Sequence, residues 1–166
     1  GTRSGGEDDV IVGMGMGLGE TGVVARVEQT PDLIKERWEL FQQINSHASV
    51  RRIELDIFGF SRGAAVAHHC ANELIKPGRG LFREVLQSGR FGLLDSFDPA
   101  VDISLNLIGL FDTVAAIGTV GKGDLSVANN INHGVNLYLP PGCARKVIQL
   151  QARDECRDNF ALNSVH

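Results

Sequence analysis

The chain has 166 residues, the length of one typical domain, and 43% of them are hydrophobic, enough to build a buried core. A formal net charge of −4 without a visible basic patch argues against a nucleic-acid partner. No run of 18 apolar residues predicts a membrane span, and three cysteines without metal-ligand spacing predict no metal site. We expect no cofactor.

The first third of the chain predicts a glycine-rich loop followed by a helix. Glycines alternate with apolar residues over 13–19, but the pattern fits neither a dinucleotide fingerprint nor a phosphate loop. Thr30-Pro31-Asp32 combines a capping hydroxyl, a first-position proline and a first-turn acid, so we expect a helix from here to about His47. A core-facing side is predicted for its apolar stripe, which consists of Ile34, Trp38, Phe41 and Ile44.

Residues 59–63, Gly-Phe-Ser-Arg-Gly, fit the pattern G-x-S-x-G in the context that gives the pattern a mechanical meaning. The apolar residues of 53–58 predict a strand before it, and those of 64–76 predict a helix after it, ended by Pro77-Gly78. Strand, tight turn and helix form a nucleophile elbow, in which the Ser61 hydroxyl stands clear of the sheet. The flanking glycines are expected because a Cβ would collide there. The alternative is a serine in a structural glycine turn.

The second half of the chain predicts further strands around loops. We expect a short helix at 81–86, an acidic loop at 95–102, a buried strand at 105–111, a long excursion at 129–141 and a last strand at 146–150. Strands that alternate with helices predict an α/β fold with a mainly parallel sheet.

Asp112 directly follows the predicted strand 105–111. An acid at the carboxyl end of a buried strand, after the elbow in the chain, occupies the place of the triad acid in an α/β hydrolase. There it would orient a histidine and stabilise its positive charge. The alternative is an aspartate that caps its own loop at 113–114. Asp95, Asp98 and Asp102 compete for the role.

Several blocks resemble one family. The chain is similar to the bacterial α/β-hydrolase group that includes the type VI secretion phospholipase effectors. Matching blocks lie at 56–65, at 109–114 with Gly118, at 154–160 and at Gly1-Thr2. The resemblance implies an α/β-hydrolase fold and hydrolysis of lipid carboxylic esters, as a phospholipase acting on the membrane of a rival cell. It further implies synthesis in a bacterial cytoplasm, type VI secretion, a cognate immunity protein and a spike protein as partners.

The chain departs from the family pattern at both ends. The family's first core strand would precede Gly1, and its histidine segment would follow residue 166, so we expect 1–166 to be the central part of one catalytic domain and to be inactive alone. Within the chain, His133 has the right order for the base, ahead of His166. His68 and His69 are expected on the helix face away from Ser61, with His69 and Glu73 forming a surface pair.

The expected reaction is acyl transfer through Ser61. The backbone N–H of Arg62 would donate to the oxyanion, and the resemblance places a second donor at Thr2. Two other functions stay open: a hydrolase-like module that binds a partner without catalysis, and an esterase or thioesterase for small substrates.

Overall fold

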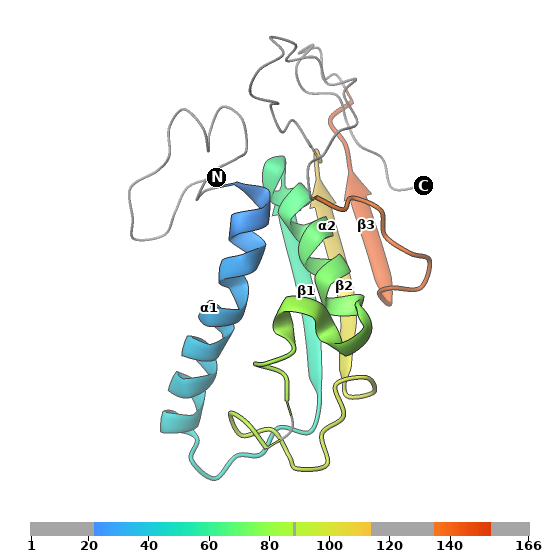
Figure 1. The fold of residues 1–166 in the computed structure, drawn as a ribbon. Coiled ribbons are helices and arrows are strands. Elements are labelled where there is room, and N and C mark those ends of the chain that lie inside the picture. The colour runs from blue at the N-terminus through green and yellow to red at the C-terminus, as the bar shows by residue number, and fades with distance from the viewer. Residues whose placement is uncertain (1–21, 88, 114–134, 154–166) are drawn as a thin grey trace.

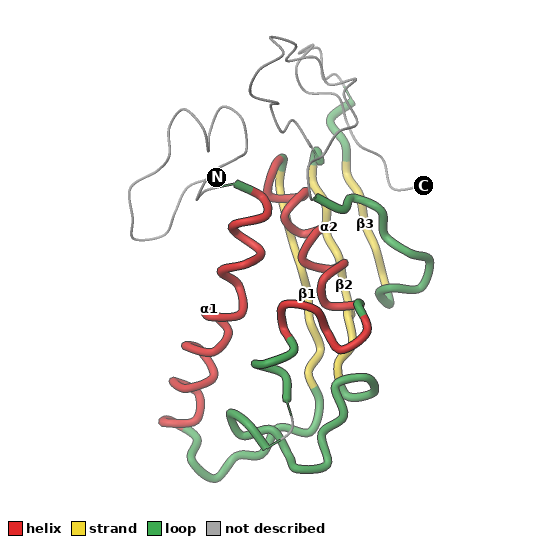
Figure 2. The backbone as a smooth tube through the Cα atoms, in the orientation of Figure 1, coloured by secondary structure: helices red, strands yellow, loops and turns green. Residues whose placement is uncertain are grey.

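The structure is a computed structural model that describes residues 22–87, 89–113 and 135–153. Its elements are α1 (Val23–Ile44), β1 (Ile53–Phe60), α2 (Arg62–Ile75), the 3-10 helix η3 (Pro77–Phe82), β2 (Ile103–Phe111) and β3 (Lys146–Leu150). Figure 1 shows α2 lying across the sheet and α1 beside α2, and Figure 2 shows the same path by element type. The described chain is therefore α/β, as the alternation of strands and helices predicts.

The three described strands form one parallel sheet in the order β1-β2-β3. At the carboxyl edge, Phe60 pairs with Phe111, and Phe111 pairs with Leu150. The register between β1 and β2 shifts once, because Leu55 pairs with Leu105 but the next residue, Asp56, pairs with Leu107. The extra residue of this bulge is Asn106, whose side-chain amide donates to the Asp56 carboxylate at 2.8 Å.

The core lies between α2 and one face of the sheet. Small side chains on α2, among them Ala64, Ala67 and Ala71, are buried against β1 and β2, where Ile108 and Leu110 are fully enclosed. Short alanines let the helix approach the strands closely, and the β-branched and leucine side chains of the sheet fill the space. The opposite face has no cover from any described helix, and its exposed apolar residues are Phe58, Phe60, Phe111 and Leu150.

Helix α1 departs from the sequence prediction at its start. It begins at Val23, about two turns before Thr30, so Pro31 lies inside the helix and not at its first position. The Thr30 hydroxyl donates back to the Arg26 carbonyl at 2.8 Å. Val23 and Val27 are buried, and Val23 packs with Ala65 and Val135. Tertiary contacts of this first turn therefore extend the helix beyond its local start signal.

The predicted apolar stripe of α1 is only partly in the core. Ile34 and Trp38 pack against the core, and the Trp38 ring contacts Phe41 edge to face at 6.0 Å between centroids. Phe41 and Ile44 are exposed, Ile44 by 73%. The last turns of α1 extend beyond α2 and η3, so the apolar residues there have no described element to pack against.

The prediction of a short helix at 81–86 is also wrong, because these residues do not form an α-helix. Residues 77–82 form η3, which contains a kink of left-handed residues from Gly78 to Gly80, and residues 83–86 are turns. Phe82, Val85 and Leu86 are buried nevertheless. The apolar spacing therefore reflects packing under α2 and not an α-helix. The acidic loop at 95–102 and the strand at 146–150 are found where they are predicted.

Candidate active site

Ser61 lies at the sharp turn between β1 and α2. Its backbone has φ 54° and ψ −123°, a combination that costs a non-glycine residue on the order of 1–3 kcal/mol. The turn is fixed on both sides, because the Ser61 N–H donates to the Phe111 carbonyl at 2.8 Å and the Ser61 carbonyl accepts from Ala64 at 3.0 Å. The side chain makes no capping hydrogen bond to α2. The strained turn therefore presents a hydroxyl that the helix does not use.

Gly59 explains how the turn can be so tight. A Cβ at this position would lie 2.2 Å from the Gly63 carbonyl oxygen and 2.5 Å from the Ala64 Cα, both backbone atoms that cannot move aside. A Cβ on Gly63 itself would have no neighbour within 4 Å. The expectation that both flanking glycines avoid a collision is thus correct for Gly59 and wrong for Gly63.

Asp112 leaves the neighbouring strand at the same edge as Ser61. It directly follows β2, with φ 46°, and its N–H donates to the Leu150 carbonyl at 2.8 Å. Its carboxylate oxygen Oδ1 accepts from the Ala152 N–H just beyond β3. This bond across the sheet orients the carboxylate, in contrast to a purely local cap at 113–114. The buried hydroxyl of the next residue, Thr113, has no hydrogen-bond partner in the described structure.

The competing acids lie at the other edge of the sheet. Asp98 and Asp102 belong to the loop that leads into β2, and the Asp102 carbonyl accepts from the N–H of Ile53, the first residue of β1. Their carboxylates close this loop, because Asp102 Oδ2 accepts from the Asp98 N–H at 2.9 Å and Asp98 Oδ1 accepts from Ala100 at 2.8 Å. Parallel strands separate this edge from the turn that carries Ser61.

Of the remaining predicted site residues, Arg62 lies in the described part of the chain and three others do not. Arg62 is the first residue of α2 and directly follows Ser61. Thr2, His133 and His166 lie outside the described residues. The structure therefore brings Ser61, Arg62 and Asp112 to one edge of the sheet, and the roles of all these residues remain predictions.

His69 and Glu73 do not form the expected surface pair. Both are buried in α2, together with His68 and Asn72. Residues 136 and 138 lie over His69 and Asn72, whereas Glu73 lies by Gly80 and pairs with Lys76. Neither ring nitrogen of His68 has a partner with hydrogen-bond geometry among the described residues. Burial lowers the pKa of His68 to about 4, against a smaller raising effect of the Leu137 backbone. No local sequence pattern predicts these contacts, since their partner is more than 60 residues away.

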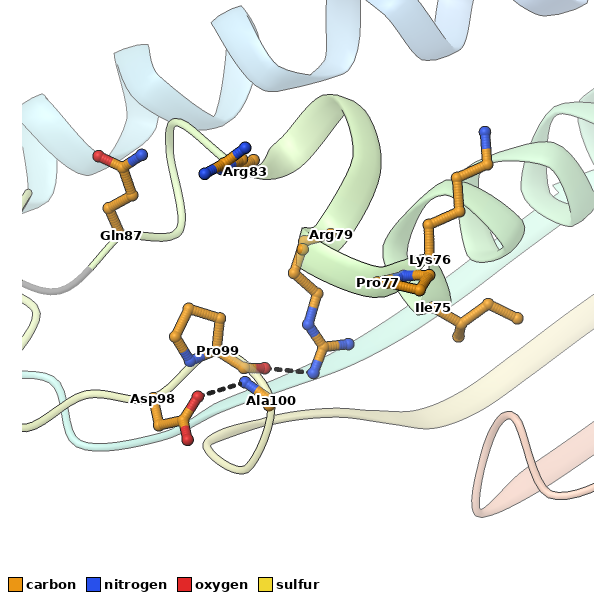
Figure 3. A pocket seen from close by; sticks show the side chains of 10 residues that line it. Ile75, Lys76, Pro77, Arg79, Arg83, Gln87, Asp98, Pro99 and Ala100 are labelled. Carbon is orange, nitrogen blue, oxygen red and sulfur yellow. Dashed lines mark hydrogen bonds between the residues drawn. The ribbon is translucent and has the colours of Figure 1, made fainter.

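A cavity of about 520 Å³ lies at the far end of α2 (Figure 3). Its lining includes Ile75, Lys76, Arg79, Arg83, Asp98 and Pro99. The Arg79 guanidinium spans the cavity wall, because it donates to the Leu74 carbonyl at 2.8 Å and to the Pro99 carbonyl. The 14 residues of α2, about 21 Å at 1.5 Å per residue, separate this cavity from Ser61. It is therefore distinct from the candidate active site.

Two further features are absent from the described residues. No group of three or more His, Cys, Asp or Glu side chains there is arranged to hold a metal ion. Of the helices that the structure describes, none combines the length and apolarity that a bilayer crossing requires. Cys70 packs against the core, and burial raises the pKa of its thiol to about 11, so this cysteine is a core residue and not a nucleophile.

Comparison with solved structures identifies one informative neighbour. Over 90% of its length, the chain is similar to the Tle1 effector in a structure of that effector bound to the VgrG spike of the type 6 secretion system, with 34% sequence identity and a TM-score of 0.67. The chain spans 30% of the length of that neighbour. A structure of an uncharacterized protein from Pseudomonas aeruginosa has 26% identity over 88% of this chain and 19% of its own, with a TM-score of 0.45. No protein-family model and no curated protein matches the chain.

Proposed function

We propose that the chain carries the nucleophile and the acid of a serine hydrolase that cleaves carboxylic esters of lipids. The observation that carries this proposal is the strained, uncapped turn at Ser61 with Asp112 leaving the adjacent parallel strand at the same sheet edge. A structural glycine turn has no need of a non-glycine residue at φ 54°. The likeness to the Tle1 effector supports the same class of protein.

The proposed reaction is acyl transfer in two steps. The Ser61 hydroxyl oxygen attacks the ester carbonyl, and its proton passes to an imidazole that Asp112 orients and then to the leaving alcohol. The N–H of Arg62 and a second donor at Thr2 stabilise the oxyanion, helped by the positive end of the α2 dipole. Water then releases the acyl group. Within these 166 residues we propose His133 as the base.

The biological setting is proposed from the neighbour. We propose that the protein is a phospholipase made in the bacterial cytoplasm, delivered by type VI secretion with the help of a spike protein, and active at the membrane surface of a target cell that lacks its immunity protein. Support comes from the likeness to an effector whose structure contains the VgrG spike. Release of fatty acid from phospholipid vesicles by the intact protein tests the substrate.

The nucleophile is tested with Ser61→Ala in the intact protein. We expect ester hydrolysis and labelling by a fluorophosphonate probe to disappear, while the folded state persists. Ser104→Ala, an exposed serine near the other end of β2, is the matched control and is expected to keep both. Asp112→Asn should lower kcat by about 10⁴ if the acid holds the tautomer of the base, and His133→Ala should do the same if it is the base.

The outcomes separate the alternatives. Full activity of a folded Ser61→Ala variant would contradict the proposal. Hydrolysis of short synthetic esters without hydrolysis of phospholipids would indicate an esterase or thioesterase. Absence of both hydrolysis and probe labelling in the unmodified intact protein would indicate a hydrolase-like binding module.

A further inference from the structure

Helix α2 buries an unusual polar surface. The side chains of His68, His69, Asn72 and Glu73 are each less than a tenth exposed, whereas such residues in a helix usually face solvent. Residues 136 and 138 contact two of them, His69 and Asn72. Buried polar groups destabilise a fold unless they are hydrogen-bonded, so this surface calls for a specific partner.

Asn72 supplies hydrogen bonds that a neighbouring strand would otherwise give. The two N–H groups of its side-chain amide donate to the Tyr138 carbonyl at 2.8 Å and to the His68 carbonyl at 2.9 Å, and the Asn136 carbonyl at 3.3 Å shares one of them. The Asn136 amide returns a bond to the Asn72 side-chain oxygen at 3.0 Å. Residues 135–140 have no regular secondary structure of their own. Side chains of α2 therefore hold their backbone in place.

His69 adds a hydrogen bond that can form only when its imidazole is neutral. The Asn136 N–H donates to His69 Nδ1 at 3.3 Å. A nitrogen that accepts this bond carries no hydrogen, so the imidazole must be neutral with its proton on Nε2. A protonated ring has N–H groups at both positions, and Nδ1–H would then face the Asn136 N–H.

The segment held by these bonds packs against α2 one helical turn from Ser61. Val135, next to Asn136, is buried with Ala65 of α2 and Val23 of α1. Ala65 lies four residues after Ser61, which is one helical turn. Leu137 and Val66 pack around the same contact. Displacement of residues 135–138 would thus remove the packing behind the first turn of α2.

We propose that Asn72 and His69 are positioning residues that hold residues 135–138 against α2 beside Ser61, and that this hold is released when His69 takes up a proton. The charged groups that act on His69 are Glu73 and Lys76 on α2 and Glu28 on α1. Burial lowers the pKa of His69, the two glutamates raise it, and Lys76 lowers it further. His68 and the exposed Tyr138 are the other titratable neighbours along α2 and the held segment. The catalytic part of this proposal rests on the function proposed above, whereas the hold itself does not.

The hold is measured by hydrogen exchange at the amides of Asn136 and Tyr138 in the intact protein, as protection factors at pH 8 and pH 5. Asn72→Ala removes the three hydrogen bonds between the Asn72 side chain and the segment, and it should lower both factors at either pH by about 10-fold. In the unmodified protein the Asn136 factor should fall at pH 5. His69→Asn offers an amide oxygen near the place of Nδ1 and cannot ionise. Because the buried His68 also titrates, the comparison is made in a His68→Leu background. There the added His69→Asn change should make the Asn136 factor the same at both pH values, whereas His68→Leu alone should keep a fall at pH 5.

Activity then tests the positioning role. With phospholipid vesicles at pH 8, kcat of Asn72→Ala should fall about 10-fold, in line with the weakened hold, and KM should change less.

Unchanged protection in Asn72→Ala, or a His68→Leu/His69→Asn variant that keeps the pH dependence of His68→Leu, would overturn the hold. If Asn72→Ala does not fold, the Asn136 protection factors at pH 8 and pH 5 still test the hold. Normal kcat in a variant with lost protection would overturn the positioning role. An unmodified protein that shows the predicted exchange without hydrolysis would refute the proposed function and leave the hold intact.

Discussion

Gly59 is the residue on which the turn at Ser61 most depends. In Gly59→Ala the new methyl group would sit 2.2 Å from a backbone oxygen, so β1 and α2 must separate. Overpacking of this kind against atoms that cannot rotate away costs at least ~1–3 kcal/mol. We expect the free energy of unfolding, measured by urea denaturation, to fall by that amount or more.

Gly63→Ala is the matched control for this change. Gly63 is in the first turn of α2, and its Cβ would meet no atom within 4 Å. Alanine favours a helix over glycine by about 0.5–1 kcal/mol, so we expect the stability to stay equal or rise. Equal losses in the two variants would show that the close approach at Gly59 does not limit the turn.

His68 makes stability depend on pH. Its pKa is about 4 in the folded protein and about 6.5 in the unfolded chain, so between these values the unfolded chain binds the proton first. Stability is therefore present above pH 6.5 and is lost as the pH falls, by up to ~1.4 kcal/mol per pH unit. His68→Leu should flatten this dependence in urea denaturation between pH 7.5 and pH 5.

The control is His47→Gln, at an exposed position after α1, which should keep the acid sensitivity of the unmodified protein. Because neither ring nitrogen of His68 has a hydrogen-bond partner in the described part of the chain, leucine also removes a desolvated polar group, and stability at pH 7.5 should not fall. An unchanged slope in His68→Leu would assign the acid sensitivity to other groups.

At the scale of elements, local signals predict those parts of the fold whose causes are local. The strands and α2 follow from apolar spacing and from the stop at Pro77, and the edge positions of Ser61 and Asp112 follow from the ends of β1 and β2. The start of α1 and the polar surface around Asn72 depend on contacts with residues 135–138. No pattern within a single segment contains that information.

Pro31 gives the clearest test of α1. Proline inside a helix removes a hydrogen bond to the residue four positions earlier, here Val27, and crowds its carbonyl, at a cost of up to about 3 kcal/mol. Pro31→Ala should therefore raise the free energy of unfolding by ~1–3 kcal/mol, measured by urea denaturation. Asp32→Ala, at the exposed next position, should change it by less than ~0.5 kcal/mol. A Pro31→Ala variant that is less stable would favour a helix that starts at Thr30.

At the scale of the whole molecule, the described helices cover one face of the sheet and leave the other face without cover. Parallel sheets in proteins are almost always covered on both faces. The open face here carries exposed Phe58, Phe60, Phe111 and Leu150. Such a contiguous apolar surface is a site for association or for aggregation.

We expect residues 1–166, prepared alone, to bind the dye ANS and to self-associate in analytical ultracentrifugation. The double substitution Phe58→Thr and Leu150→Thr should reduce both effects, because it removes apolar surface from the open face. Val101→Thr, equally exposed but in the loop before β2, is the control and should leave them unchanged. Monomers without dye binding would mean that this face is covered in solution.

The bulge at Asn106 divides β2 into two parts that respond differently to changes of length. Beyond it, the pairing from Asp56 with Leu107 to Phe60 with Phe111 sets Ser61 and Asp112 level with each other. Before it, the pairing runs from Ile53 with Ile103 to Leu55 with Leu105, and Asn106 is the one residue of β2 without a partner in the ladder. Deletion of Asn106 would give a regular ladder with the same downstream partners. A change of length in the loop before Ile103 can thus leave Ser61 and Asp112 level with each other, because the pairing beyond the bulge is counted from Leu107.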